Sequence, residues 1–394
     1  MPLSQSRLIE TGPAILLSLL VLGLTTCSLG YLGFAAWCVM HFQIRAAVAS
    51  PNAPSVSVLK PICGLDADLY ENLRSICQQD YPVFQVVFGV ADALDPALTI
   101  LHQLQAEFPL CDIKIIVDPR LIGANAKVSN LANILRSARH DLLVIADSDM
   151  RVGPEYLATV VQSLMAPGVG AATCLYKAVA KRGIASRLGA DFVNDWFLPS
   201  VLVAHYFEPL RYCFGATMAL RRDVLEEIGG FECLRDVLAD DYMLGKRVAA
   251  RGYRVALVPY LVENVVAEPD LRALFMHELR WARTVRTVRP IGYAMSLVTH
   301  ALPMSLLLFT LSPWHKLAFL LVALSVVGRI AMHILSRTAF RLEAERWYWR
   351  APLRDALSFF VWAISFCGRN VYWRERSFVV DSNGVLEPRE DPSA

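Results

Sequence analysis

The chain consists of long apolar runs near its two ends and a central region in which short apolar and polar stretches alternate. Residues 13–40, 292–311 and 317–335 are apolar runs long enough to cross a bilayer with some tilt. A fourth run, residues 356–373, is interrupted by Arg369 and predicts either a weaker span or a short re-entrant or interfacial segment. The first run is too long for the apolar part of a cleaved signal peptide, so we expect an uncleaved anchor.

In residues 55–150, short apolar stretches alternate with amphipathic ones. The apolar stretches predict strands at residues 56–59, 85–90, 113–117 and 142–146. The amphipathic stretches predict helices over residues 66–78 with Asp66 as N-cap, from Asp95-Pro96 onward, and over residues 125–137. This alternation predicts an α/β fold with a mainly parallel sheet and helices on both faces, which binds ligands beyond the carboxyl ends of its strands.

Acidic residues stand where two of these strands end. Asp147 and Asp149 follow the strand at residues 142–146, and Asp92 follows the strand at residues 85–90. The three carboxylates are therefore expected on one rim of the sheet. Hard divalent cations take oxygen ligands and bridge to phosphates, so the Asp147/Asp149 pair predicts a metal–diphosphate site. Helix caps and turns are the alternative, and they are the better interpretation of Asp92 taken alone.

The usual glycine-rich phosphate loops are absent from the sequence, which has neither G-x-G-x-x-G nor G-x-x-x-x-G-K-[ST]. A bound nucleotide would need a metal and cations such as Lys127 to neutralise its diphosphate. Downstream, Asp240 and Asp241 open an amphipathic helix that ends at Gly252. Acids at a helix start complement its dipole, but two exceed the need of a cap, and one is a candidate general base.

Two further segments each allow two interpretations. Arg280 and Trp281, shortly before the second apolar run, are either a membrane-interface anchor or a phosphate-binding pair. The apolar run at residues 196–204 is either a core element or a segment that touches the membrane. Arg329, within the third run, is expected to extend its side chain to the membrane surface.

Composition and charge bear on the compartment. The chain has 394 residues, 55% of them hydrophobic, and a mean hydropathy of +0.41, which is too apolar for an ordinary soluble protein. Arginines crowd residues 272–289 and 337–354, so the positive-inside rule predicts that residues 45–290 are cytoplasmic. The net charge of +2 and the lack of a basic, aromatic-interleaved patch predict no nucleic-acid partner. The nine cysteines show no CxxC spacing, and those of the cytoplasmic domain predict buried thiols and not disulfides or zinc ligands.

Together, these motifs resemble those of inverting, membrane-bound glycosyltransferases of the family 2 and 21 type. Their order is an Asp that ends a strand, a DxD, a [ED]D-Y pair and an xxxRW segment, here Asp92, Asp147/Asp149, Asp240-Asp241 and Arg280-Trp281. Within that group the chain is similar to ceramide glucosyltransferases and, most of all, to hopanoid biosynthesis-associated glycosyltransferases. The segments that carry the latter resemblance are KPICGLDADLYENLRSICQQDYP, DPRLIGANAKVSNL and HELRWARTVRTVRP.

The resemblance implies a GT-A-like fold and a set of donor-binding roles. Asp92 would contact the uracil or ribose of a UDP-sugar. Asp147 and Asp149 would hold Mg²⁺ or Mn²⁺ on its diphosphate. Arg280 and Trp281 would close the site over the diphosphate and acceptor. The first position of the (Q/R)xxRW motif is His277 here, which alters one contact of the family.

The resemblance also implies the reaction. Asp241 would be the catalytic base, supported by Asp240, and a sugar would pass with inversion from a UDP-sugar to a membrane lipid hydroxyl. N-acetylglucosamine with a hopanoid polyol, or glucose with ceramide, are the implied pairs. A processive polysaccharide synthase and a non-enzymatic nucleotide-binding membrane protein are the alternatives.

The expected organisation has four parts. They are an N-terminal anchor (residues 1–45), a cytoplasmic GT-A-like domain (46–290), a membrane region of two to three spans (291–375) and a polar tail (376–394). The chain is thus expected to be a multi-pass protein of a bacterial inner membrane.

Overall fold

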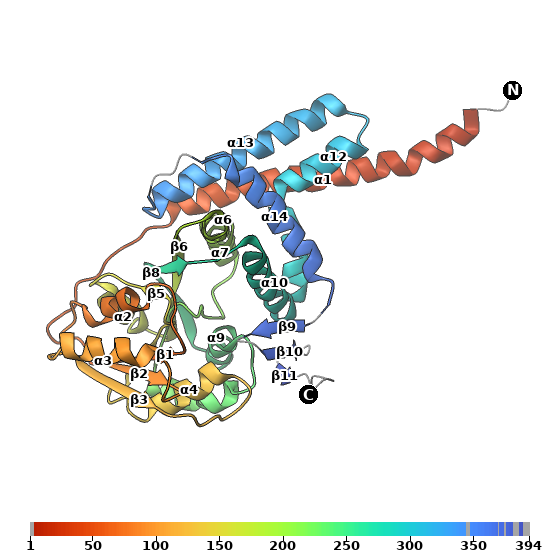
Figure 1. Ribbon diagram of the computed structural model, residues 1–394. Coiled ribbons are helices and arrows are strands. Elements are labelled where there is room, and N and C mark those ends of the chain that lie inside the picture. The colour runs from red at the N-terminus through yellow and green to blue at the C-terminus, as the bar shows by residue number, and fades with distance from the viewer. Residues whose placement is uncertain (1–3, 344–346, 369, 374–375, 381–385, 389–394) are drawn as a thin grey trace. The chain divides into compact units, whose positions relative to one another are not determined.

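Two compact units make up the protein in the computed structural model, which describes residues 4–343, 347–368, 370–373, 376–380 and 386–388 (Figure 1). The sheet unit comprises residues 43–187, 207–268 and 369–394. The helical unit comprises residues 1–42, 188–206 and 269–368. Each unit is therefore built from three separate stretches of chain.

One half of the main sheet is parallel, as the alternation predicts. Its strands run in the order β3-β2-β1-β4, with bounds β1 (Val56–Ile62), β2 (Phe84–Val90), β3 (Asp112–Val117) and β4 (Leu142–Ile145). The connecting helices are α2 (Leu69–Cys77), α3 (Ala97–Glu107) and α4 (Ala126–Leu135). Every residue of β1 and β4 is buried, because elements cover both faces of this half of the sheet.

The other half makes the sheet mixed. β4 pairs antiparallel with β7 (Met218–Arg221), which pairs antiparallel with β6 (Val169–Ala180). β6 runs parallel to β8 (Arg254–Val266), and β5 (Met150–Arg151) closes the edge antiparallel to β8. The helices of this half are α5 (Tyr156–Leu164), α8 (Arg222–Glu227) and α9 (Asp240–Ala250), with the 3₁₀ turn η2 (Phe231–Leu234). The predicted α/β fold is confirmed.

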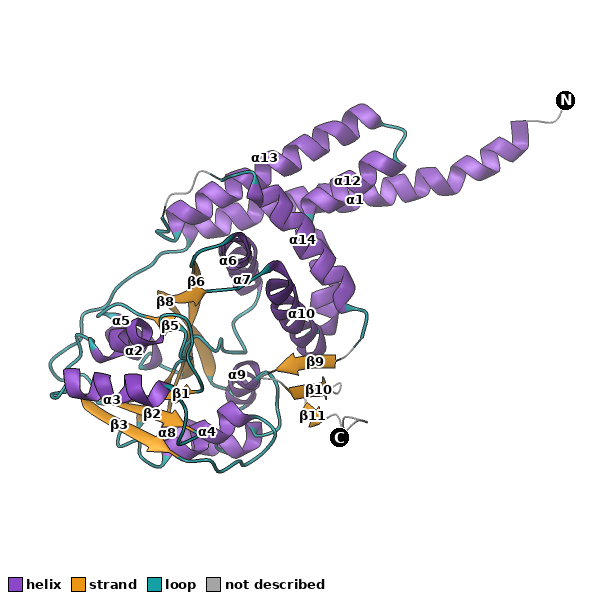
Figure 2. Ribbon diagram, in the orientation of Figure 1, coloured by secondary structure: helices purple, strands orange, loops and turns teal. Residues whose placement is uncertain are grey.

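A small antiparallel sheet follows near the C-terminus. Its strands are β9 (Asn370–Trp373), β10 (Arg376–Val380) and β11 (Leu386–Pro388), in the order β11-β10-β9. The segment expected as a polar tail therefore contains two strands. Figure 2 shows strands in the sheet unit, whereas the described part of the helical unit is α-helical with short π and 3₁₀ segments.

Two helices of the helical unit are long and apolar enough to cross a membrane. They are Pro13–His41 within α1 (Ser4–His41), and α13 (His315–Ala339). These helices confirm the first and third apolar runs as candidate spans. α12 (Ala301–Leu311) lies beside both of them (Figure 1).

The second apolar run is not one straight span. It is divided into α11 (Pro290–Met295), the 3₁₀ turn η3 (Ser296–Thr299) and α12, and the two parts are bent by 67°. Pro303 lies in the first turn of α12, where its ring excludes a continuous helix from the preceding residues. Only the first part of the fourth run, residues 356–365, belongs to α14 (Arg350–Ser365), which is not among the candidate spans of the described chain; Arg369 lies outside the described residues.

The apolar run at residues 196–204 belongs to the helical unit. α6 (Ile184–Phe192) continues through a π-helical turn, η1 (Val193–Phe197), into α7 (Leu198–Phe207). Leu198, Val201 and Leu202 are buried, which supports the core interpretation of this run. The prediction for Arg329 is wrong, because its side chain is buried and ion-paired with Asp355 at 2.6 Å instead of reaching the surface.

Candidate functional site

A carboxylate cluster forms around Lys127 in the sheet unit. Asp147 follows β4, Asp240 begins α9, and Lys127 lies in the first turn of α4. The Lys127 Nζ atom is 2.7 Å from Asp147 Oδ1 and 3.2 Å from Asp240 Oδ2. Burial alone would lower the pKa of Lys127, but Asp147, Asp240 and Asp241 outweigh it and hold the pKa above its ordinary value. The ammonium group is therefore a fixed positive charge in this cluster.

Backbone amides hold the Asp241 carboxylate in place. Asp241 Oδ1 accepts a hydrogen bond from the Tyr242 amide at 2.7 Å, and Oδ2 accepts one from the Gly215 amide at 2.8 Å. The N-cap residue of α9 is Ala239, which makes no side-chain cap hydrogen bond, so neither acid of the pair is the N-cap. Burial, and then the neighbouring Asp240, raise the pKa of Asp241 to about 6.

Gly215 lies between two of the acids and leaves no room for a side chain. A Cβ atom at this position would be 2.8 Å from Asp147 Oδ2 and 3.4 Å from Asp241 Oδ2. The same atom would be 3.6 Å from Lys127 Nζ. Bare backbone is thus what lets these three charged groups approach one another.

Asp149 occupies a second, deeper part of the site. Its Oδ2 accepts a hydrogen bond from Asn264 Nδ2 at 2.8 Å, whereas Oδ1 is buried without a partner in the described chain. Burial, and then Asp147 and Asp66, raise the pKa of Asp149 to about 7. Lys60 opposes this shift, and its own Nζ donates to the Asp147 carbonyl oxygen at 2.8 Å.

These residues fit a divalent cation. Asp147, Asp149, Asp240 and Asp241 supply four carboxylates, whereas Lys60 and Lys127 supply two ammonium groups. The cluster therefore carries excess negative charge, and the unpartnered Asp149 oxygen is a hard ligand of the kind that Mg²⁺ and Mn²⁺ prefer. The metal predicted at Asp147 and Asp149 stays a prediction.

Asp92 lies on the same edge of the sheet but outside the cluster. It follows β2, which is separated from β4 only by β1. Its side chain is exposed, and Oδ1 accepts a hydrogen bond from the Leu94 amide at 2.9 Å, as in a turn. Asp66 is not the N-cap of α2 as predicted, because that helix begins at Leu69 and Asp66 accepts a hydrogen bond from the Ser148 hydroxyl.

Arg280 and Trp281 belong to the helical unit, on α10 (Leu271–Val288). The Trp281 ring lies 4.4 Å from His277 and 6.2 Å from Phe192, measured between ring centroids. His277, which replaces the Gln or Arg of the family motif, therefore packs edge-on against the motif's tryptophan. The roles predicted for Arg280 and Trp281 remain predictions.

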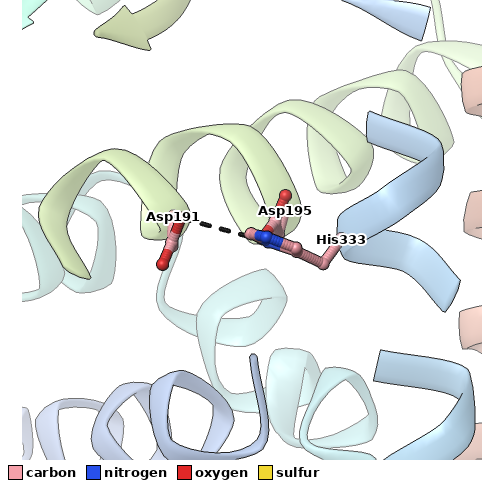
Figure 3. Close-up of side chains that lie close together, drawn as sticks. All are labelled: Asp191, Asp195 and His333. Carbon is pink, nitrogen blue, oxygen red and sulfur yellow. Dashed lines mark hydrogen bonds and ion pairs between the residues drawn. The ribbon is translucent and has the colours of Figure 1, made fainter. Parts of the chain in front are cut away.

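A second acidic cluster, Asp191, Asp195 and His333, is buried in the helical unit (Figure 3). The ligand atoms of these three side chains lie within 4.8 Å of one another, close enough to hold a metal ion. Arg350 Nε is 3.0 Å from Asp191 Oδ2, however, and His333 Nδ1 is 2.5 Å from Asp195 Oδ2. Arg350 thus already occupies Asp191, and Asp195 is hydrogen-bonded to His333.

A comparison of the sequence with known families decides the class of protein. The profile described as Glycosyl transferase family 21 matches residues 20–386, which is most of the chain. The chain belongs to glycosyltransferase family 21. This membership argues against the non-enzymatic alternative and agrees with the resemblance carried by the acidic motifs.

Named relatives of this family 21 chain include ceramide glucosyltransferases. Ceramide glucosyltransferase 1 of Caenorhabditis elegans is 26% identical over 245 residues, which cover 62% of this chain and 52% of the relative. Ceramide glucosyltransferase of Gibberella zeae is 30% identical over 179 residues, which cover 41% and 33%. The chain thus spans about half the length of the first of these relatives, and less of the second.

Among solved structures, the chain is similar to a mannosyltransferase from Pyrobaculum calidifontis in complex with GDP-Man and Mn²⁺. The TM-score is 0.55 at 20% identity, over 89% of this chain and 99% of the other. At this identity the likeness concerns the fold alone, and it supports the glycosyltransferase fold predicted from the sequence.

Three residues of the site were missed from the sequence: Lys60, Gly215 and Asn264. Lys60 carried a signal, because a lysine within the largely apolar strand VSVLKPI demands a buried partner. No pattern in the sequence indicates Gly215 or Asn264, because the side chains that they contact in the site are remote in sequence.

Proposed function

We propose that this family 21 chain transfers a sugar from a UDP-sugar to a hydroxyl group of a membrane lipid, with inversion at the anomeric carbon. The observation that carries the proposal is the Asp147–Lys127–Asp240 cluster, with Asp241 held beside it by the Gly215 amide. It unites a donor-side acid, a fixed cation and a candidate base at the carboxyl-terminal rim of the parallel strands. Ligands bind at this rim in α/β sheets of this kind.

On the donor side, Asp147 and Asp149 would hold Mg²⁺ or Mn²⁺, and Asp92 would contact the uracil or ribose. The cation, when bound, would neutralise charge on the diphosphate as it leaves. Lys127 would add a permanent positive charge beside Asp147. Arg280 and Trp281 would close over the diphosphate and the acceptor.

On the acceptor side, Asp241 would remove the proton from the lipid hydroxyl. Its pKa of about 6 leaves it ionised at neutral pH, yet basic enough to accept a proton. The hydroxyl oxygen would form a bond to the anomeric carbon as the bond to UDP breaks on the opposite side. A single displacement converts an α-linked donor into a β-glycoside.

The lipid acceptor is supported by the two candidate membrane helices and by the ceramide glucosyltransferase relatives. We propose the two acceptor and donor pairs implied by the resemblance, a hopanoid polyol with N-acetylglucosamine or ceramide with glucose. The catalytic unit would face the cytoplasm of a bacterial inner membrane, where UDP-sugars are made.

The test uses the full-length protein in lipid nanodiscs with radiolabelled UDP-N-acetylglucosamine or UDP-glucose, and with ceramide or a hopanoid polyol as acceptor. We expect a β-glycolipid from the wild type, and at least a thousandfold loss of transfer from Asp241→Asn with donor binding retained. Asp141→Asn is the control, since the Asp141 side chain is 92% exposed. Retained turnover by folded Asp241→Asn would refute the assignment of the base.

A further inference from the structure

A narrow crevice lies inside the helical unit, between the two candidate membrane helices and the π-helical turn. Its lining comes from α1, from η1 with the start of α7, and from α13: Tyr31, Leu32, Ala35, Asp195, Trp196, Pro199, Ser200, Arg329 and Met332. In this conformation the crevice has no room for a water molecule. Polar atoms there must therefore find partners in the protein or in a ligand.

The π-helical turn supplies two of those polar atoms. Such turns are rare and are found most often at functional sites. Asp195 uses Oδ2 to bind His333, while its buried Oδ1 has no partner among the described residues. The Trp196 ring stacks between Phe192 and His300, and its Nε1 is likewise buried without a partner in the described chain.

α13 supplies a third atom through Arg329. This side chain is 6% exposed and uses one terminal nitrogen to bind Asp355 and the Thr299 carbonyl oxygen. Its Nε has no partner in the part of the chain that the structure describes. One acceptor and two donors without partners thus belong to three side chains that line the same crevice.

The charges of the lining select the chemistry of a ligand. Asp195 is hydrogen-bonded to His333, and Arg329 is paired with Asp355 at 2.6 Å, so the lining leaves no free cation for a phosphate group. A hydroxyl group both donates and accepts, as these atoms require. Because α1 and α13 are candidate spans, such a group would enter on a lipid.

We propose that this crevice binds a hydroxylated headgroup of an uncharged membrane lipid. Its hydroxyl groups would donate to Asp195 Oδ1 and accept from Trp196 Nε1 and Arg329 Nε. Binding requires the lining to open, since the crevice is closed as it stands. That this lipid is the acceptor of glycosyl transfer rests on the proposed function.

Binding is measured on the full-length protein in nanodiscs without UDP-sugar, by the shift in thermal unfolding temperature as ceramide or a hopanoid polyol is added. Trp196→Phe keeps a ring for the stack but removes Nε1–H, so we expect about three- to tenfold weaker binding of the hydroxylated lipid. Trp362→Phe is the matched control, since its Nε1 donates to the Tyr293 carbonyl oxygen at 3.0 Å. It should leave lipid affinity unchanged.

Three results would overturn the proposal: equal lipid affinity of wild type and Trp196→Phe, equal stabilisation by the same hydrocarbon without hydroxyl groups, or displacement of the hydroxylated lipid by phosphatidic acid. Transfer is then measured separately with UDP-sugar added. Lipid binding that Trp196→Phe weakens, in a protein that transfers no sugar from either donor, would refute the proposed function and leave the binding site standing.

Discussion

Substitution of Gly215 by alanine tests whether Asp147 and Asp241 work as one site. The new Cβ would lie 2.8 Å from Asp147 Oδ2, whereas ordinary contact begins at 3.4 Å. Asp147 would have to move by about 0.6 Å, which exceeds the roughly 0.5 Å within which a catalytic group must be held. Its ion pair with Lys127, 2.7 Å long, resists that movement.

We expect kcat/KM of Gly215→Ala to fall by about 10- to 100-fold, since an error of about 1 Å in placement costs about 100-fold. The unfolding temperature should change by no more than about 3 °C, because the alanine restricts the unfolded chain and so offsets part of the strain. The assay is sugar transfer in nanodiscs beside thermal unfolding. Gly292→Ala is the control, because its nearest contact would be an ordinary 3.9 Å. Wild-type kcat/KM for Gly215→Ala would refute the reasoning.

Three further predictions concern pH, metal and stability. As the proposed base, Asp241 would act as a carboxylate, and its pKa is raised to about 6. Therefore kcat/KM should be constant above about pH 7 and fall tenfold per unit below pH 6; a flat profile from pH 5 to 8 would contradict this. Asn264→Ala removes the 2.8 Å hydrogen bond to Asp149, so titration of transfer with Mn²⁺ should show about 10- to 100-fold weaker activation, restored by excess ion. Arg354→Leu leaves the Glu278 carboxylate buried without the arginine that donates hydrogen bonds to it at 2.8 and 2.6 Å. Thermal unfolding should therefore show a free energy of unfolding that is lower by about 3–5 kcal/mol, and the double variant Arg354→Leu/Glu278→Leu should largely restore it.

The parallel half of the sheet was predictable because β1, β2 and β3 are each followed by a helix and then by the next strand. β6 and β8 pair across a long stretch of sequence, and no local pattern indicates that pairing. The same division holds for the site. Acids at strand and helix ends are visible as motifs, whereas the need for glycine at position 215 appears only when Asp147 and Asp241 are side by side.

The sequence also did not indicate that charged side chains are buried in the helical unit. Arg329 in an apolar run was expected at the membrane surface because its partner, Asp355, lies in another segment. Likewise, residues 196–204 were predicted within the catalytic domain, because the strands before and after them in the sequence belong to the sheet unit. These residues belong to the helical unit because of contacts with residues that come much later in the chain.

The assembly of the helical unit from separate stretches of chain has a consequence for its synthesis. Asp195 and Asp191 emerge from the ribosome before the residues that pair with them, His333 and Arg350, which lie 138 and 159 positions further along the chain. At ordinary rates of translation this gap lasts about 10–30 s. During that interval the continuous helical segment from α6 through η1 to α7 carries two carboxylates without these partners, which disfavours stable packing of the segment against the apolar helices α1 and α13. Release of the chain before residue 350 would therefore leave this helical segment without the partners that balance its carboxylates.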